Sequence, residues 1–188
     1  MITYRDIPGW FDEQDAEFYA RMVSECSFPA TFVEVGCWFG RSTVCLAQEI
    51  QKQKKHISVF AVDTWRGSPS DTDQMEVVAK PGESILMAFC KNVVNAEIAE
   101  VVVPMEMDSV SAAEIFDLNS LAFVFIDADH DEPCVATDIA AWLPKIGHGG
   151  VIAGHDYEAD NCPGVKAAVD KAFPDGVEIH GTCWFKRA

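Results

Sequence analysis

Acidic and histidine side chains follow two predicted strands at positions where they could meet. Asp127 comes directly after the apolar run 121–126, and His155 and Asp156 follow a strand that opens at Gly149. Neighbouring strands of a sheet lie ~4.8 Å apart, so side chains that leave their carboxyl ends can converge on one ion. Carboxylates suit magnesium, whereas a histidine nitrogen favours a softer ion such as manganese, zinc or iron. The alternative is a strand-end turn in which His155 and Asp156 only cap a helix.

A glycine turn precedes the first predicted helix of the sheet. Gly36 and Gly40 stand four residues apart, between a β-rich run at 31–36 and a helical pattern. Glycine allows the backbone to approach a ligand, and the helix N-terminus beyond it can receive a carboxylate. The spacing differs from the Gly-x-Gly-x-x-Gly of dinucleotide sites, which argues against a NAD-dependent oxidoreductase.

Asp63 ends the next predicted strand, and an acid at this place can accept hydrogen bonds from both hydroxyls of a ribose. Taken alone, the glycines and Asp63 are also compatible with a plain turn and a helix-capping acid. Both interpretations stay open at this point.

Strands and helices must alternate along the chain to bring these residues to one edge of a sheet. The predicted strands span 31–36, 57–62, 100–104, 121–126, a fifth opening at Gly149, 176–180 and 182–186. The predicted helices span 12–26, Gly40 to Ile50, a face from Ile85 to Val93, 110–116, 135–146 and 163–173. The run 121–126 is apolar on both faces, which is typical of a central parallel strand.

The last two predicted strands are separated only by the His180–Gly181 region, which is too short for a parallel crossover. We therefore predict an α/β fold, a Rossmann-like doubly wound sheet of about seven strands that ends in an antiparallel hairpin. A length of 188 residues predicts one domain over 1–188. Within it, 1–29 would be a covering helical segment and 64–81 a substrate or lid loop.

Charge and composition limit the classes of partner. The formal net charge of -16 repels phosphate backbones and anionic membranes, so we expect neither nucleic acid nor a membrane as partner. The seven cysteines include no Cys-x-x-Cys pair, and the N-terminus lacks the basic start and apolar core of a signal peptide. These features predict a cytoplasmic protein. A homo-oligomer stays open.

Four segments together resemble one family. They are Phe32-Val-Glu-Val-Gly-Cys-Trp-Phe-Gly-Arg-Ser, Ala61-Val-Asp-Thr-Trp, Phe125-Ile-Asp-Ala-Asp-His and Gly149-Gly-Val-Ile-Ala-Gly-His-Asp-Tyr. The chain is similar in these segments to class I S-adenosylmethionine-dependent methyltransferases, and within them to the macrocin-type and caffeoyl-CoA or catechol-type O-methyltransferases. The resemblance covers roughly residues 30 to 186.

The resemblance implies a binding site for S-adenosylmethionine. It places the methionine part at the glycine turn, the methionine carboxylate at Ser42, the ribose at Asp63 and the adenine after the third strand. The cofactor residues that it implies are Glu34, Gly36, Trp38, Gly40, Ser42, Asp63, Trp65, Asp108, Ser109 and Asp127.

The resemblance also implies a metal site and a base. The family has an Asp where Asp127 stands and an Asp-Asn or Asp-Asp pair where this chain has His155 and Asp156, so His155 is a departure from the pattern. His130 stands three residues beyond Asp127, where the catechol and caffeoyl-CoA enzymes carry a lysine that is thought to take the hydroxyl proton, and a histidine could do the same. Alternatively, residues 129–132 are only a solvated, acidic helix start.

Together these features predict a methyltransferase that acts on a hydroxyl oxygen of a small molecule, with Asp127 and His130 as catalytic residues. We expect a divalent ion, magnesium or manganese, held by Asp127, His155 and Asp156. The alternatives are a metal-independent methyltransferase, a cofactor-binding module without catalysis and, with less support, a NAD-dependent oxidoreductase. The loop residues show no pattern that identifies the acceptor.

Overall fold

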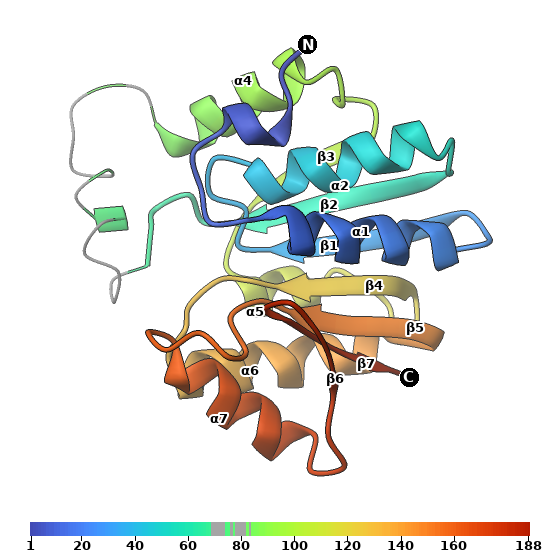
Figure 1. Cartoon of the computed structure of the whole chain (residues 1–188), viewed down its shortest axis with the longest axis vertical. Coiled ribbons are helices and arrows are strands. Elements are labelled where there is room, and N and C mark those ends of the chain that lie inside the picture. The colour runs from blue at the N-terminus through green and yellow to red at the C-terminus, as the bar shows by residue number, and fades with distance from the viewer. Residues whose placement is uncertain (69–73, 76, 78–81, 83) are drawn as a thin grey trace.

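The structure is a computed structural model that describes residues 1–68, 74, 75, 77, 82 and 84–188. A seven-stranded sheet forms the centre of this part of the chain (Figure 1). The strand order is β3-β2-β1-β4-β5-β7-β6. The strands are β1 (Ala30–Val35), β2 (Ile57–Asp63), β3 (Val102–Glu106), β4 (Leu121–Ile126), β5 (Ile146–Gly154), β6 (Glu178–His180) and β7 (Cys183–Arg187). The first five strands are parallel, and β7 is antiparallel to both β5 and β6. The predicted α/β fold, with its antiparallel C-terminal pair, is confirmed.

Helices cover both faces of the sheet. The α-helices whose bounds the structure describes are α1 (Glu13–Glu25), α2 (Arg41–Lys52), α4 (Ile85–Asn95), α5 (Ser109–Ala113), α6 (Glu132–Trp142) and α7 (Pro163–Ala172). In β4, Phe123 and Phe125 pack with α1, α2 and α4, whereas Val124 and Ile126 pack with α5, α6 and α7. This alternation explains why the strand is apolar along its whole length.

Two details of the predicted elements were wrong. The helix predicted over 135–146 ends at Trp142 and continues as a 3-10 turn, Leu143–Lys145, because Pro144 has no amide hydrogen for the helix. As a result β5 begins at Ile146, before the predicted Gly149. The last strand, β7, lies between β5 and β6, so β6 forms the edge of the sheet.

The N-terminal segment folds across the start of α2. A 3-10 turn, Tyr4–Asp6, precedes α1, and the Arg41 side chain donates hydrogen bonds to the carbonyls of Ile7 (2.9 Å) and Phe11 (2.8 Å). Of the predicted lid loop 64–81, residues 69–73, 76 and 78–81 lie outside the described residues. None of the described helices combines the length and apolar sequence needed to cross a bilayer.

A buried acid lies on the inner side of α6. Asp138 is 7% exposed, and its carboxyl group interacts with the hydroxyl of Ser109, which also accepts a hydrogen bond from Trp142 Nε1 at 2.9 Å. Burial raises the pKa of Asp138 from 3.8 to about 6, although the bond to Ser109 opposes the shift. Because the charged form is disfavoured in the fold, Asp138 reduces stability once it ionises.

We predict that Asp138→Asn stabilises the protein in a pH-dependent way. The folded pKa lies above the unfolded one, so the cost of Asp138 is small below pH 4, grows through pH 6 and is constant above that. A difference of this size corresponds to about 3 kcal/mol at most. Urea unfolding at pH 4.5 and pH 8 should show that the variant gains clearly more stability over wild type at the higher pH. An equal gain at both values would contradict the assignment.

Candidate active site

Backbone hydrogen bonds continue the sheet past the carboxyl ends of its central strands. The amides of Gly36, Asp127 and His155 donate to carbonyls near the ends of β2, β1 and β4, at 2.9, 2.8 and 3.1 Å. These bonds fix the first residue after each strand in one row across the sheet. The row is the place where ligands bind in open α/β sheets.

Gly36 is required by close packing within this row. Its φ is +87°, and a Cβ at this position would lie 2.0 Å from the carbonyl oxygen of Asp127. No larger residue fits without separating β1 from β4. The glycine turn and Asp127 therefore hold each other in position.

A cavity of about 730 Å³ lies over the row. Its lining includes the turn after β1, the ends of β2, β4 and β5, and residues 8–11 of the N-terminal segment. The predicted site residues that line it are Gly36, Trp38, Ser42, Asp63, Ser109, Asp127, His130, His155 and Asp156. The predicted residues that the described lining does not include are Glu34, Gly40, Trp65 and Asp108.

Glu34 lies beneath the cavity, where it joins three elements. Its carboxyl group is fully buried in β1, accepts a hydrogen bond from the hydroxyl of Tyr19 in α1 at 2.8 Å and is also bonded to Thr43 in α2. Burial raises the pKa of Glu34, although its hydroxyl partners oppose the shift. In this structure Glu34 supports the glycine turn from below.

The other three residues outside the lining surround the site. Gly40 has φ +87° and precedes the first residue of α2. Trp65 is buried and donates from Nε1 to the carbonyl of Trp38 at 2.9 Å. Asp108 caps α5 through a hydrogen bond of 2.9 Å to a backbone amide. They shape the backbone at these three places, and residues next to them in the sequence line the cavity.

Asp63 braces the glycine turn. One of its carboxylate oxygens accepts the amides of Cys37 and Trp38, each at 2.8 Å, and the other accepts the amide of Trp65 at 2.6 Å. A carboxylate has about four acceptor positions, so Asp63 can still receive ribose hydroxyls. Its placement at the cavity agrees with the predicted role, which stays a prediction.

Asp127, His155 and Asp156 come together as the sequence predicts. Each offers a ligand atom, and these atoms lie within 4.8 Å of one another. His155 Nδ1 is 3.3 Å from Asp156 Oδ2 and 3.8 Å from Asp127 Oδ1. Asp156 has a left-handed backbone, φ +60°, an uncommon conformation that turns the chain directly after β5.

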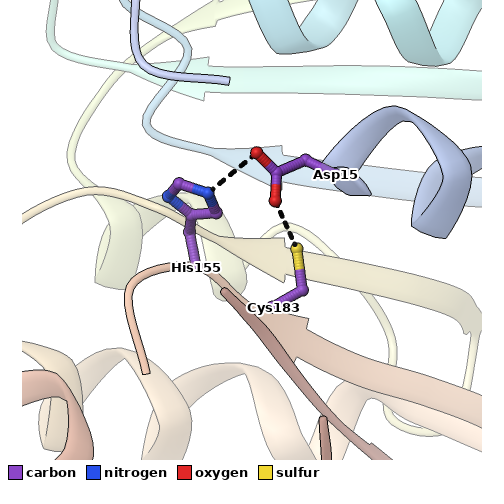
Figure 2. A group of neighbouring side chains, drawn as sticks. All are labelled: Asp15, His155 and Cys183. Carbon is purple, nitrogen blue, oxygen red and sulfur yellow. Dashed lines mark hydrogen bonds and ion pairs between the residues drawn. The ribbon is translucent and has the colours of Figure 1, made fainter. Parts of the chain in front are cut away.

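The opposite side of the His155 ring faces α1. Its Nε2 is 3.2 Å from Asp15 Oδ2, and Figure 2 shows Asp15 between the ring and Cys183. Burial alone would lower the pKa of His155, but the carboxylates of Asp127, Asp15 and Asp156 outweigh it and raise the pKa to about 11. Likewise, burial would raise the pKa of Asp15, but hydrogen bonds from His155 and the Asp12 amide lower it to about 2.

His130 approaches the same carboxylates from the cavity side. Its Nε2 lies 3.3 Å from Asp156 Oδ2 and 3.8 Å from Asp127 Oδ1, and the side chain is 36% exposed. Its interaction with Asp127, with further charge from Asp156, raises the pKa of His130 against the effect of burial. A base that is both exposed to the cavity and next to carboxylates can accept a proton and hold it.

Asp15 is the residue that the sequence prediction missed. It lies on the same face of α1 as Phe18, Tyr19 and Met22, all of which are buried. An acid on the apolar face of an amphipathic helix needs a buried partner. The spacing of Asp15 from these apolar residues could therefore have indicated a buried, paired acid. The partner, His155, is too far away in the sequence to be identified from it.

Fold and site together define an α/β protein with its ligand crevice at the carboxyl edge of a parallel sheet. A family model described as "Methyltransferase domain" matches residues 33–157, which include the glycine turn, Asp63, Asp127 and the His155–Asp156 pair. The chain therefore belongs to this methyltransferase family, and its fold is that of the class I S-adenosylmethionine-dependent enzymes.

Solved structures with the same fold include several methyltransferases. The O-methyltransferase NovP is 18% identical with a TM-score of 0.68, covering 93% of this chain and 79% of its own. The calicheamicin methyltransferase CalS11 is 15% identical with a TM-score of 0.67, covering 92% and 76%. A SAM-dependent O-methyltransferase from Thermotoga maritima is 16% identical with a TM-score of 0.56, covering 87% and 51%.

One curated relative matches in sequence. It is the uncharacterized protein y4gI of Sinorhizobium fredii, which is 25% identical over 130 residues, or 69% of this chain. The matched part makes up only 13% of that much longer protein.

We predict that Gly36→Ala destabilises the protein by more than the strain of its left-handed backbone alone would cost. Gly176→Ala is the matched control, because Gly176 has a similar φ of +85° and open space where a Cβ would be, whereas Gly36 has φ +87° and a contact of 2.0 Å. The shared strain costs about 1 to 2 kcal/mol, and the clash should cost Gly36→Ala several kcal/mol more. Thermal unfolding of both variants measures this, and equal losses would contradict it.

Proposed function

We propose that this chain transfers a methyl group from S-adenosylmethionine to a hydroxyl oxygen of a small molecule, with a divalent ion beside Asp127 and Asp156. One observation carries the proposal: a single cavity is lined both by the glycine turn after β1 and by the Asp127–His155–Asp156 cluster. That two structures of the same fold belong to O-methyltransferases also supports oxygen as the acceptor atom.

The cofactor half of the cavity has donors and acceptors suited to S-adenosylmethionine. Within the described part of the chain no side chain caps the start of α2, so its first amides can receive a carboxylate, and Ser42 lines the cavity there. Asp63 lies at the end of β2, where it can accept ribose hydroxyls, and Ser109 lies after β3, where the adenine would follow. The bound cofactor supplies the methyl group, which the acceptor oxygen takes by in-line displacement.

The donors of the cluster fit a divalent ion. Ligand atoms about 2.1 Å from one ion lie roughly 3 to 4.2 Å from each other, and those of Asp127, His155 and Asp156 lie within 4.8 Å. Such an ion supplies positive charge that lowers the pKa of a nearby hydroxyl. The two carboxylates hold that charge at the cavity wall.

His130 is the base in this proposal. It lines the cavity, and its imidazole can take the proton that the acceptor hydroxyl loses as its oxygen forms the bond to carbon. The resulting imidazolium is stabilised by Asp156 Oδ2 at 3.3 Å and by Asp127. The pair therefore keeps the proton on His130 while the cofactor loses its positive charge.

The net charge of -16 favours an uncharged or cationic small molecule over a phosphate-rich acceptor. Trp10 lines the cavity and is 63% exposed, so it offers an apolar surface for the acceptor.

A metal-independent methyltransferase is the second candidate, and His155 is the observation that favours it. A protonated His155 between Asp15, Asp127 and Asp156 neutralises part of the negative charge that an ion would otherwise balance. His130 would then deprotonate the acceptor without help from a metal.

We predict that S-adenosylmethionine and its demethylated product bind the purified protein and that NAD does not. Asp63→Ala should weaken binding by about tenfold or more, because each hydrogen bond to a carboxylate contributes ~1.5 to 3 kcal/mol. Asp117→Ala removes an exposed acid and serves as control. Calorimetry with all three nucleotides decides this, and NAD binding without a response to the sulfur compounds would overturn the proposal.

We predict that a chelator and Asp156→Asn both abolish methyl transfer while cofactor binding persists. His130→Ala should lower the rate by ~10² to 10⁴, the range for a lost general base. His148→Ala, an exposed histidine at the opposite edge of the sheet, should leave the rate unchanged. Labelled cofactor with a panel of phenols and glycosides measures transfer. Full activity in excess chelator, with no metal by elemental analysis, would select the metal-independent candidate.

A further inference from the structure

Asp15 holds His155 from outside the cavity. It is 2% exposed, and its Oδ2 lies 3.2 Å from His155 Nε2. Its Oδ1 accepts the hydroxyl of Thr182 at 3.0 Å and the thiol of Cys183 at 3.5 Å, the latter drawn with the His155 pair in Figure 2. The backbone amide of Asp12 also donates to Oδ2, at 2.8 Å. The carboxylate is therefore fixed by the N-cap residue of α1 and by two residues at the start of β7.

These contacts place a hydrogen on Nε2 of His155. An ionised carboxylate only accepts, so the Nε2 that faces Asp15 must donate. Thr182 agrees with this: its single hydroxyl hydrogen is directed at Asp15, so its oxygen accepts from Nε2 at 2.8 Å. Nδ1 lies on the other side of the ring, facing Asp127 and Asp156.

We infer that Asp15 is a positioning residue for the proposed ion site, where it keeps the hydrogen on Nε2 and leaves Nδ1 of His155 as a nitrogen ligand. The inference rests on the ion site of the proposed function. The resulting set of one nitrogen and two carboxylates suits manganese, iron, cobalt or zinc better than magnesium or calcium. A carboxylate behind a ligating histidine commonly fixes the ring and makes it a stronger ligand.

The structure also gives this arrangement a mechanical consequence. Asp15 belongs to α1, and in the next turn of that helix the hydroxyl of Tyr19 donates a hydrogen bond to Glu34. A shift of α1 would therefore move the carboxylate that orients His155. Ion affinity should accordingly depend on a residue that touches neither the cavity nor the ion.

The test is metal binding by the purified full chain without cofactor. Wild type is titrated with Mn²⁺, Co²⁺ and Mg²⁺ by calorimetry, and the visible spectrum of bound Co²⁺ is recorded. Asp15→Asn keeps the size of the side chain but removes its charge. Glu17→Gln removes the same charge from the exposed face of α1 and is the matched control.

We expect wild type to bind Mn²⁺ and Co²⁺ more tightly than Mg²⁺. Asp15→Asn should weaken Mn²⁺ and Co²⁺ binding by about 10- to 100-fold and alter the cobalt spectrum, whereas Glu17→Gln should match wild type. His155→Asp, which supplies only oxygen ligands, should shift the preference toward Mg²⁺. If Asp15→Asn does not fold, Thr182→Val decides, with a smaller loss in the same direction.

Unchanged Mn²⁺ affinity and an unchanged cobalt spectrum in folded Asp15→Asn would overturn the inference. So would wild type that binds none of the three ions, in which case His155 is itself the cation of the cluster. Calorimetry with S-adenosylmethionine on the same samples separates this result from failure of the proposed function. Cofactor binding without ion binding refutes the inference and selects the metal-independent methyltransferase, whereas absence of cofactor binding refutes the methyltransferase.

Discussion

The placement of His155 between carboxylates is the interaction on which the site depends. Asp15 lies on one side of the ring at 3.2 Å, and Asp156 on the other at 3.3 Å, with Asp127 at 3.8 Å. A buried carboxylate without a compensating charge costs several kcal/mol. His155 compensates these acids in one of two ways: as a protonated ring between them, or as a nitrogen ligand to an ion that balances their charge.

This constraint makes the N-terminal helix part of the site. Two polar links, Asp15 to His155 and Tyr19 to Glu34, lie one helical turn apart on the same buried face of α1. Breaking either would leave a buried charge or hydroxyl without its partner, so α1 cannot separate from the sheet without exposing the cluster. The same helix bonds Thr182, directly before β7, and this joins the two ends of the chain at one carboxylate.

Local patterns explain which features the sequence predicts. The faces of β4 follow from alternation, and Asp127 and His155 meet because parallel strands end at a common edge. Local patterns do not predict the partners of Glu34 and Asp15. Whether Glu34 faces a ligand or Tyr19, and which residue faces Asp15, depends on how a helix packs onto the sheet. The position of β7 between β5 and β6 is likewise a choice among antiparallel pairings that local sequence does not encode.

The glycine turn after β1 is held in shape by its own contacts. Asp63 fixes it from the side through the amides of Cys37 and Trp38, Gly36 packs against Asp127, and Glu34 ties the strand beneath it to α2. A loop already ordered in the free protein loses little conformational entropy when it binds. The cavity wall at residues 8–11 differs, because Arg41 joins that segment to α2 through two side-chain hydrogen bonds. In the proposed function, cofactor recognition would therefore rest on the sheet, whereas acceptor recognition would rest on segments whose sequence can change without disturbing it.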